Sequence, residues 1–227
     1  MTKMLASVTG VDEALLALDE NVDIIDLKQP AAGALGALDI SVVKTIVAAL
    51  ANRCPVSATI GDMPMQAEPI LNAVQNMAET GVDYVKIGFF PDSATWPATI
   101  EKLAVLAPKN IALIAVLFAD QQPDMAIIPM LKQAGFTGVM LDTQAKQQGS
   151  LNQVMASDTI QHFVSLAKSH QLLCGLAGSL TLASIPRLLP YQPDYLGFRG
   201  ALCDQHIRTG QLNCHAIRQI KRVLTEG

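Results

Sequence analysis

The chain is poor in the residues that build metal sites, disulfide frameworks and nucleic-acid surfaces. Among its 227 residues are four histidines, none of them in an HxxxH arrangement, and four cysteines without CxxC or CxxxC spacing. A zinc site is therefore not expected, and the cysteines are expected to be reduced thiols. The 16 lysines and arginines are outnumbered by 20 acidic residues, which gives a net charge of −4 and argues against the basic face that nucleic-acid binding needs.

Long hydrophobic runs are also missing, although 50% of the residues are hydrophobic. The longest apolar runs, such as residues 111–119, have about half of the roughly 20 residues that a membrane helix requires. The N-terminal residues MTKMLASVTG lack the apolar core of a signal peptide. We therefore expect a cytoplasmic protein that has neither nucleic acid nor a membrane as partner. The sequence leaves a homo-oligomer open.

Two kinds of segment alternate along the whole chain. Short runs rich in Val, Ile, Leu and Ala have the composition of strands, and the stretches between them repeat apolar residues with the period of a helix. The predicted strands are residues 4–8, 22–28, 55–61, 83–89, 111–119, 138–143, 172–178 and 194–200. The predicted helices are residues 11–20, 40–51, 67–79, 94–106, 124–134, 157–170, 182–189 and 212–224.

Eight strand–helix units without a break in composition predict one α/β domain over residues 1–227. Strands joined by helices of this length form parallel sheets with right-handed crossovers. Eight such units are typical of a closed (β/α)8 TIM barrel, whose usual length is about 250 residues. An open doubly wound sheet is the alternative, but it would place a glycine-rich fingerprint after the first strand, where SVTGVDEA has a single glycine. The pattern favours the barrel.

Charged residues gather at the predicted carboxyl ends of the second, fourth and sixth strands. In a barrel, alternate strand residues face the lumen, and chemistry collects at these ends. The residues concerned are Asp26, Lys28, Lys86, Asp142 and Lys146. A single Lys–Asp pair is as often structural as catalytic, and a loop lysine such as Lys146 is usually only solvated. Two acids and three lysines together favour a catalytic site, because each buried charge costs several kcal/mol unless it is matched.

Such a cluster suits amine chemistry. A lysine with a pKa near 10.4 is neutral in only about 0.04% of molecules at pH 7, whereas a pKa of roughly 7 makes about half of them nucleophilic. Burial beside a second ammonium lowers a lysine pKa in this direction. A neutral amine adds to a carbonyl, and the resulting iminium withdraws electrons from the neighbouring carbon. Aldol and elimination reactions use that electron sink, while the acids orient the amines and move protons.

The loops after the seventh and eighth strands predict a phosphate site. LAGS places Gly178 and Ser179 in the first loop, and GFRG places Arg199 and Gly200 in the second. In TIM barrels these two loops often hold phosphate on exposed backbone N–H groups. Glycine allows a close approach, the serine has a hydroxyl donor, and the arginine adds charge. The following loop, residues 201–211, is expected to be solvated, although it could close over the site.

These segments together resemble one known family. The stretches DIIDLKQPAAGALGA, VSATIGD, DYVKIG, MLDTQAK, LAGS and GFRGALC, in this order over nearly the whole chain, resemble the (5-formylfuran-3-yl)methyl phosphate synthases of methanofuran-type cofactor biosynthesis. The resemblance implies a lyase that condenses two molecules of glyceraldehyde 3-phosphate, with loss of phosphate and water. It also implies a reaction that needs no metal and no organic cofactor.

The resemblance further implies a role for each member of the charged cluster. Lys28 would form the Schiff base, Lys146 would transfer protons, and Lys86 would assist or hold phosphate. Asp26 and Asp142 would position the amines and shuttle protons. The sequence departs from the family after LAGS, where LTLAS lacks the lysines expected in archaeal members, so no secondary phosphate contacts are carried over there.

Two other functions fit part of the pattern. An orotidine-phosphate-decarboxylase-like enzyme also uses alternating Asp and Lys residues, but it would need an acid soon after Lys28, where QPA supplies none. A non-catalytic phosphosugar-binding barrel would keep the phosphate loops but would gain little from the lysine cluster. Only the Schiff-base enzyme would form a covalent adduct with a triose phosphate on borohydride reduction.

Overall fold

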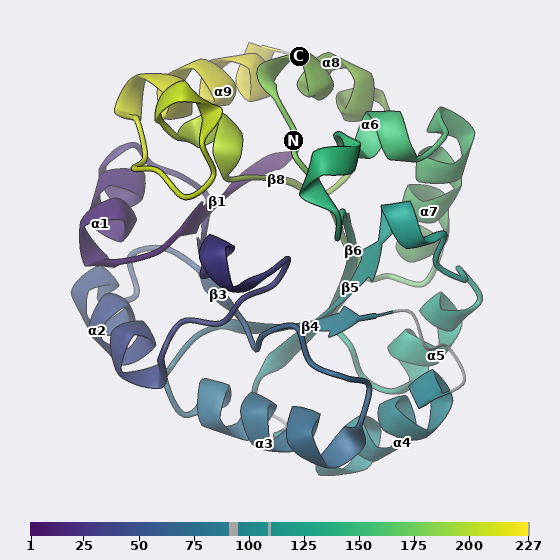
Figure 1. The fold of residues 1–227 in the computed structure, drawn as a ribbon. Coiled ribbons are helices and arrows are strands. Elements are labelled where there is room, and N and C mark those ends of the chain that lie inside the picture. Colours follow the sequence, from purple (N-terminus) through teal and green to yellow (C-terminus); the bar gives the residue numbers. More distant parts are fainter. Residues whose placement is uncertain (91–94, 109, 227) are drawn as a thin grey trace.

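The eight runs rich in Val, Ile, Leu and Ala are the parallel strands of a closed barrel in the computed structural model, which describes residues 1–90, 95–108 and 110–226 (Figure 1). The strands follow the chain around the barrel, and the eighth closes against the first. They are β1 Lys3–Val8, β2 Ile24–Leu27, β3 Val56–Thr59, β4 Tyr84–Phe89, β5 Ala112–Phe118, β6 Gly138–Asp142, β7 Leu173–Leu176 and β8 Tyr195–Phe198. The predicted (β/α)8 barrel is confirmed.

The stretches with helical period form the outer ring of the barrel (Figure 1). The α-helices are α1 Val11–Asp19, α2 Ile40–Leu50, α3 Ala67–Ala78, α4 Trp96–Leu106, α5 Ile127–Gln133, α6 Leu151–Val154, α7 Ser157–Ser169, α8 Ile185–Leu188 and α9 Cys214–Glu226. The sequence does not predict α6, a single turn ahead of α7. The predicted start of the fourth helix, residue 94, lies outside the described residues.

One predicted helix, over residues 182–189, is shorter and broken. It divides into the 3-10 helix η5 (Leu182–Ser184) and the single turn α8. Pro186 lies at the start of α8 and has no N–H to continue a hydrogen-bond ladder from the preceding turn. Apolar spacing alone therefore overestimated the regularity of this segment.

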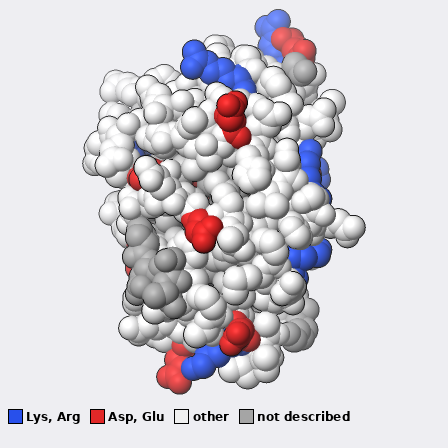
Figure 2. All heavy atoms as spheres, turned by 90° about the vertical axis from the view of Figure 1, so that its right-hand side faces the viewer, with Lys and Arg blue, Asp and Glu red and all other residues white. Residues whose placement is uncertain are grey.

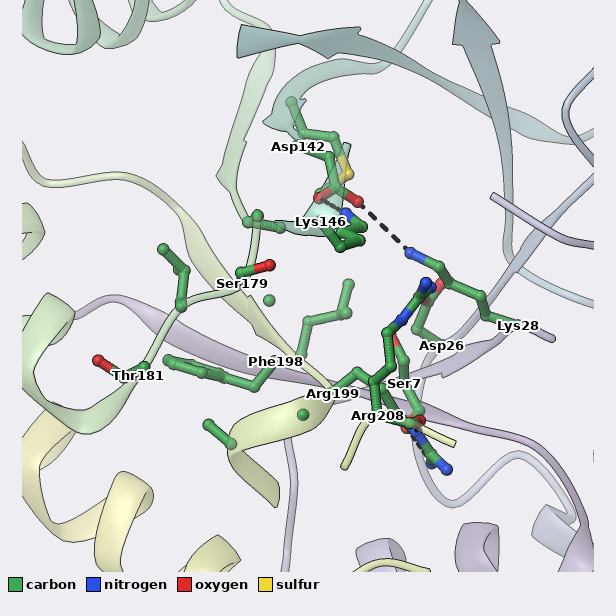
Figure 3. A pocket seen from close by; sticks show the side chains of 18 of the residues that line it. Ser7, Asp26, Lys28, Asp142, Lys146, Ser179, Thr181, Phe198, Arg199 and Arg208 are labelled. Atoms are coloured by element: carbon green, nitrogen blue, oxygen red, sulfur yellow. Dashed lines mark hydrogen bonds and ion pairs between the residues drawn. The ribbon is translucent and has the colours of Figure 1, made fainter. Parts of the chain in front are cut away.

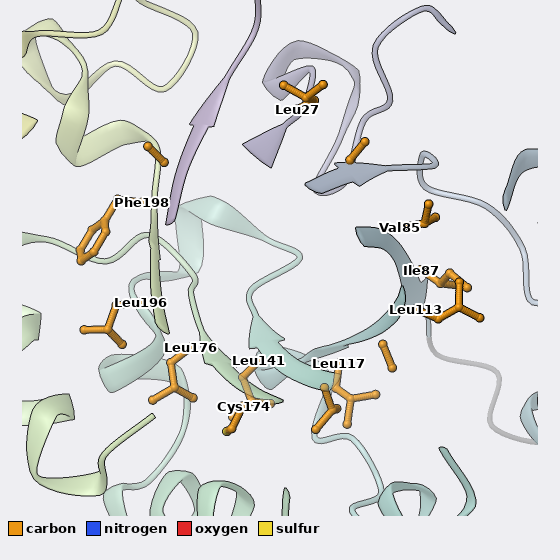
Figure 4. Packing of buried hydrophobic residues seen from close by; sticks show 14 of the residues in the cluster. Leu27, Val85, Ile87, Leu113, Leu117, Leu141, Cys174, Leu176, Leu196 and Phe198 are labelled. Carbon is orange, nitrogen blue, oxygen red and sulfur yellow. The ribbon is translucent and has the colours of Figure 1, made fainter. Parts of the chain in front are cut away.

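Apolar side chains pack in two layers, one on each side of the strands. Leu27, Ile87, Leu117 and Phe198 belong to the large outer cluster, which packs between the barrel and its helices (Figure 4). The smaller inner cluster fills the lumen with Leu5, Ile114, Val116, Phe118, Met140, Ala177 and Tyr195, joined by Ala34 and Leu35. Because the strands are covered on both faces, most of their residues are apolar on either side, and the buried polar and charged residues interrupt this pattern only on the lumen side.

The loop between β2 and α2 lies across the barrel mouth, where Figure 1 shows it near the centre of the ring. Asp62 holds this loop, since its carboxylate accepts the backbone N–H groups of Ala34 and Leu35 at 2.8 and 2.6 Å. A Cβ on Gly33 would lie 2.2 Å from the same carboxylate, and Gly33 has φ of +133°, so only glycine fits there. The loop places Leu35 in the inner cluster with Phe118 and thereby covers that side of the mouth.

Charged side chains are few and scattered on the face of the molecule over α5 and α7 (Figure 2). This agrees with a chain in which 16% of the residues are charged. Among the described helices, none combines the length and the apolar character that a membrane span requires.

The close approach of Gly175 to the Tyr195 ring yields a prediction about stability. A Cβ on Gly175 would lie 2.3 Å from the ring, which is buried in the lumen. We expect Gly175→Ala to lower the free energy of unfolding by about 1–3 kcal/mol, because the ring must move within a packed core. Urea unfolding measures the change. Gly10→Ala is the control, since its added methyl meets nothing within 4 Å, and an equal loss in both variants would contradict the explanation.

Candidate active site

Five charged side chains meet at the carboxyl end of the barrel, where the sequence predicts them. Asp26 of β2, Lys28 directly after it, Lys86 of β4, Asp142 of β6 and Lys146 of the following loop all line one cavity of about 250 Å³ (Figure 3). The first four are buried, with 6% exposure or less, and Lys146 is partly buried. The structure therefore brings the whole predicted cluster together.

Asp26 is bound on both carboxylate oxygens deep in the cavity. Oδ1 lies 2.5 Å from Lys86 Nζ and accepts the Ser57 hydroxyl at 2.6 Å, while Oδ2 accepts the Ser7 hydroxyl at 2.8 Å. Strand register explains this arrangement, because Ser7 pairs with Asp26 across β1 and β2, and Asp26 pairs with Ser57 across β2 and β3. Side chains in register on parallel strands face the same way. The hydrogen bonds offset the cost of burying a carboxylate.

Asp142 binds two lysines at once. Its Oδ1 lies 2.5 Å from Lys146 Nζ and accepts the backbone N–H of Thr143 at 2.7 Å. Its Oδ2 lies 3.4 Å from Lys28 Nζ, the contact drawn as a dashed line in Figure 3. Within the described part of the chain this is the only hydrogen bond or ion pair of the Lys28 ammonium. Lys28 is thus the least tightly held amine of the three.

A second carboxylate fixes the turn that carries Lys146. Asp120, which follows β5, accepts the backbone N–H groups of Gln144 and Ala145 at 2.8 and 2.7 Å. The 3-10 helix η4 (Lys146–Gln148) begins directly after this anchored turn. Lys146 therefore binds Asp142 from a loop that is held in place. Its position in a loop did not by itself indicate that it belongs to the cluster.

Burial and mutual charge shift the pKa values in the cluster. Burial would raise the pKa of Asp26, but Lys86 and Lys28 outweigh it and hold that pKa below its usual range. The pKa of Asp142 is likewise lowered, because Lys146 and Lys28 outweigh the effect of burial. Burial lowers the pKa values of Lys86 and Lys146, and the nearby Lys28 ammonium lowers both further, against the raising effect of their carboxylate partners.

The loops after β7 and β8 border the same cavity. Gly178, Ser179 and Gly200 all line it. Gly178 and Ser179 have φ values of +107° and +47°, so the chain makes a left-handed turn here. A Cβ on Gly178 would lie 2.7 Å from the Thr143 side chain, which explains the glycine. Among the hydrogen bonds of the described residues, none involves the Ser179 N–H or hydroxyl, so both are available to a ligand.

Arg199 departs from its predicted role. Its guanidinium donates to both oxygens of Glu13 at 2.6 and 3.2 Å. It also donates to three backbone carbonyls, those of Ser7, Arg208 and Gly210, at 3.0, 2.7 and 2.7 Å. These five hydrogen bonds use all the N–H donors of an arginine. The expected contact of Arg199 with phosphate is not supported by this geometry, because no donor is left for it.

Several residues of the site were not predicted from the sequence, and Arg208 and Ser7 are two of them. Arg208 lines the cavity, and Figure 3 shows its side chain reaching toward Lys28 while that of Arg199 turns away. Ser7 lines it as well and binds Asp26. The alternation of Leu5 and Ser7 in the first strand was a usable signal for the serine. Nothing in the local sequence distinguishes Arg208 from an arginine in a solvated loop.

The fold and the site define the class of the protein. Buried lysines and carboxylates at the carboxyl-end mouth of a (β/α)8 barrel form the active-site arrangement of a TIM-barrel enzyme. The described residues contain no group of three or more His, Cys, Asp or Glu side chains placed to hold a metal ion.

Comparison with known proteins then gives the family. Residues 4–221 match the family model described as 4-HFC-P synthase, so the chain belongs to that family. It is 39% identical over 99% of its length, and 92% of the relative, to a protein of Methylorubrum extorquens provisionally named (5-formylfuran-3-yl)methyl phosphate synthase. It is 32% identical to the (5-formylfuran-3-yl)methyl phosphate synthase of Methanocaldococcus jannaschii, over 97% of this chain and 98% of that one. The predicted family resemblance is confirmed.

Solved structures agree on the fold. The 3-hexulose-6-phosphate synthase of Salmonella typhimurium matches with a TM-score of 0.68 at 16% identity, covering 99% of both chains. The phosphoribosyl anthranilate isomerase of Thermus thermophilus matches with a TM-score of 0.67 at 12% identity, covering 100% of this chain and 99% of that one. At such identities the likeness establishes the barrel and nothing about the reaction.

The lowered pKa of Asp142 predicts how stability depends on acid. Below about pH 5 the unfolded chain binds more protons than the folded one at this residue, so the free energy of unfolding falls as the pH falls. Asp142→Asn should reduce this slope by up to about 1.36 kcal/mol per pH unit, the contribution of one proton. Urea unfolding between about pH 5 and pH 2.5 measures it. The exposed Asp158→Asn in α7 is the control, and an unchanged slope in Asp142→Asn would contradict the prediction.

Proposed function

We propose that this enzyme is a lyase that condenses two molecules of glyceraldehyde 3-phosphate to (5-formylfuran-3-yl)methyl phosphate through a lysine Schiff base, in methanofuran-type cofactor biosynthesis. Membership of the 4-HFC-P synthase family supports the product, since relatives that match nearly the whole chain carry its name. The lysine cluster supports the mechanism, because aldol addition and phosphate elimination both need an electron sink beside a carbonyl.

One observation supports Lys28 as the nucleophile. Lys86 and Lys146 each lie 2.5 Å from a carboxylate oxygen, whereas the one contact of Lys28 within the described residues is at 3.4 Å. An amine must leave its ion pair to attack a carbonyl, so the lysine with the weakest ion pair gives up the least interaction energy. Lys28 then forms the iminium, while Asp142 keeps it directed into the cavity.

Lys86 and Lys146 move the protons. Their lowered pKa values leave a larger neutral fraction at neutral pH than a solvated lysine has. Once the first triose is held on Lys28 as an iminium, one of these amines removes a proton from the neighbouring carbon and an enamine results. Asp26 and Asp142 hold the two amines in place and stabilise them when they become protonated.

The enamine supplies the electrons for the remaining steps. It forms the carbon–carbon bond to a carbonyl carbon of the second triose phosphate, and elimination expels one phosphate as the electron pair leaves with its oxygen. Ring closure and dehydration then give the furan, and hydrolysis of the iminium breaks the bond to Lys28, which frees the formyl group and the lysine amine. The atoms balance when one inorganic phosphate and two molecules of water leave, with no net oxidation or reduction. The iminium is the electron sink, so the proposed reaction needs no metal and no organic cofactor.

The loops after β7 and β8 hold a substrate phosphate in this proposal. Gly178, Ser179 and Gly200 line the cavity, and the Ser179 N–H and hydroxyl are available within the described hydrogen bonds. Backbone N–H groups bind phosphate oxygens well where glycine allows a close approach. Arg199 contributes indirectly, through the loop that it anchors.

Covalent trapping tests the Schiff base. Wild-type protein incubated with glyceraldehyde 3-phosphate and borohydride should gain the mass of a reduced triose phosphate adduct, which peptide mapping should place on Lys28. Lys28→Ala should lose this adduct and lower turnover by at least about a thousandfold, because the other two amines of the cavity are held in ion pairs at 2.5 Å. Intact-protein mass spectrometry and assay of the furan product measure the two effects.

The exposed Lys44→Ala is the matched control, since it removes a lysine from the surface of α2. It should keep both the adduct and the turnover. Active wild-type protein that forms no adduct would refute the Schiff base and favour a decarboxylase-like mechanism. Inactive protein that still binds phosphosugars without an adduct would favour the non-catalytic barrel.

A further inference from the structure

The segment of the chain between β8 and α9 forms a closed loop that borders the cavity. We name this segment, residues Gly200–Leu212, the strap. Its two ends meet, because Cys203 and Leu212 form an isolated antiparallel bridge. The Asn213 N–H donates to the Leu202 carbonyl at 2.7 Å and closes the base further. The base of the strap is therefore fixed to the fold by hydrogen bonds, while residues 204–207, 209 and 211 are exposed, as the sequence predicts for a solvated loop.

Arg199 and Glu13 anchor the strap to the barrel. Arg199 binds the carbonyls of Arg208 and Gly210 in the strap at 2.7 Å each, and its remaining donors bind Glu13 and the Ser7 carbonyl. Glu13 Oε1 also accepts the Leu212 N–H at 3.2 Å. Burial would raise the pKa of Glu13, but Arg199 outweighs it and lowers that pKa, so the carboxylate stays ionised. This ion pair fixes the backbone on both sides of residue 209.

Because the strap is anchored in this way, the Arg208 side chain points into the cavity. It is half-buried, and Figure 3 shows its guanidinium on the side of the cavity where Lys28 lies. Its one hydrogen bond within the described residues runs from Nη2 to the Gly33 carbonyl at 3.1 Å, and it has no carboxylate partner there. Burial lowers its pKa from the usual value, which reflects the cost of holding this cation away from water.

Asp142 and Asp62 attract the Arg208 guanidinium, but among the described residues no carboxylate lies within 4.0 Å of it, so an anion from outside the chain would stabilise it further. The two carboxylates of the cavity are already taken up by the three lysines. A guanidinium presents parallel N–H donors that match two oxygens of a phosphate, and such charge-assisted pairs are about twice as strong as neutral ones. The opposite wall supplies the Ser179 N–H and hydroxyl.

We propose that Arg208 binds a phosphate monoester in this cavity, and that the Glu13–Arg199 ion pair positions Arg208 for this contact. The inference rests on the proposed function for the identity of that phosphate, which would be carried by the triose on Lys28. Arg208 also bridges the strap to the loop after β2 through Gly33, so a bound phosphate would tie both covering loops to the substrate.

Direct binding tests Arg208 without any turnover. The probe is sn-glycerol 3-phosphate, a phosphate monoester that has no carbonyl and cannot form an imine. Isothermal titration calorimetry should show binding of the probe to wild type. The affinity should fall about tenfold to a hundredfold in Arg208→Ala, and less in Arg208→Lys, which keeps the charge but lacks the two parallel N–H donors. Arg222→Ala, which removes an exposed arginine from α9, should bind as wild type does. Equal binding by wild type and Arg208→Ala, or no binding by wild type, would overturn the proposal.

Borohydride trapping with two aldehydes distinguishes phosphate binding by Arg208 from a general structural role of this residue. Arg208→Ala should reduce the borohydride-trapping rate with glyceraldehyde 3-phosphate at least about tenfold more than the rate with unphosphorylated glyceraldehyde. Glu13→Gln should show the same selective loss to a smaller degree, as expected of a positioning residue. Equal losses with both aldehydes would overturn the proposal. If wild type forms no adduct at all, the Schiff base fails, and the glycerol 3-phosphate titration still decides the role of Arg208.

Discussion

The pairing of three lysines with two carboxylates inside an apolar barrel is the constraint on which the rest of this structure depends. Each of these groups would lose several kcal/mol of hydration if it were buried alone. The two carboxylates prevent this by taking ion pairs at 2.5 Å with Lys86 and Lys146, and serine hydroxyls and a backbone N–H take up their remaining capacity. The lumen can therefore be polar at one end and packed with Leu, Ile, Phe and Tyr over the rest of its length.

The loops around the mouth follow from the same requirement. A buried ion pair tolerates little movement, and the backbone segments around the mouth are each fixed by a carboxylate that takes no part in the cluster. Asp120 holds the turn before Lys146, Asp62 holds the loop after β2, and Glu13 holds the strap through Arg199. Each of these acids accepts two or more N–H donors. The site is thus built from an inner set of buried charges and an outer set of acids that position backbone.

The sequence predicted the inner set better than the outer one, for a physical reason. Asp26, Lys28 and Lys86 sit in or directly beside strands, where a period of two and the closure of the barrel determine the side that each residue faces. Arg199 has the correct parity and borders the mouth, yet its guanidinium turns to Glu13, a residue 186 positions away. Such a long-range partner leaves no trace in local spacing. The same holds for Arg208, whose direction depends on an anchored strap.

The charge count of the cavity leaves a place for an anion from outside the chain. Three ammonium groups and the Arg208 guanidinium face two carboxylates, while the second arginine of the lining, Arg199, is paired with Glu13, so the mouth holds an excess of positive charge among its described residues. That excess helps to keep the pKa values of Lys86 and Lys146 low, because an ammonium beside another ammonium is disfavoured. A third carboxylate would stabilise the resting protein but would raise those pKa values. Under the proposed function the missing anion is the phosphate of the substrate, so its binding would change the electrostatics of the lysine with which that substrate reacts.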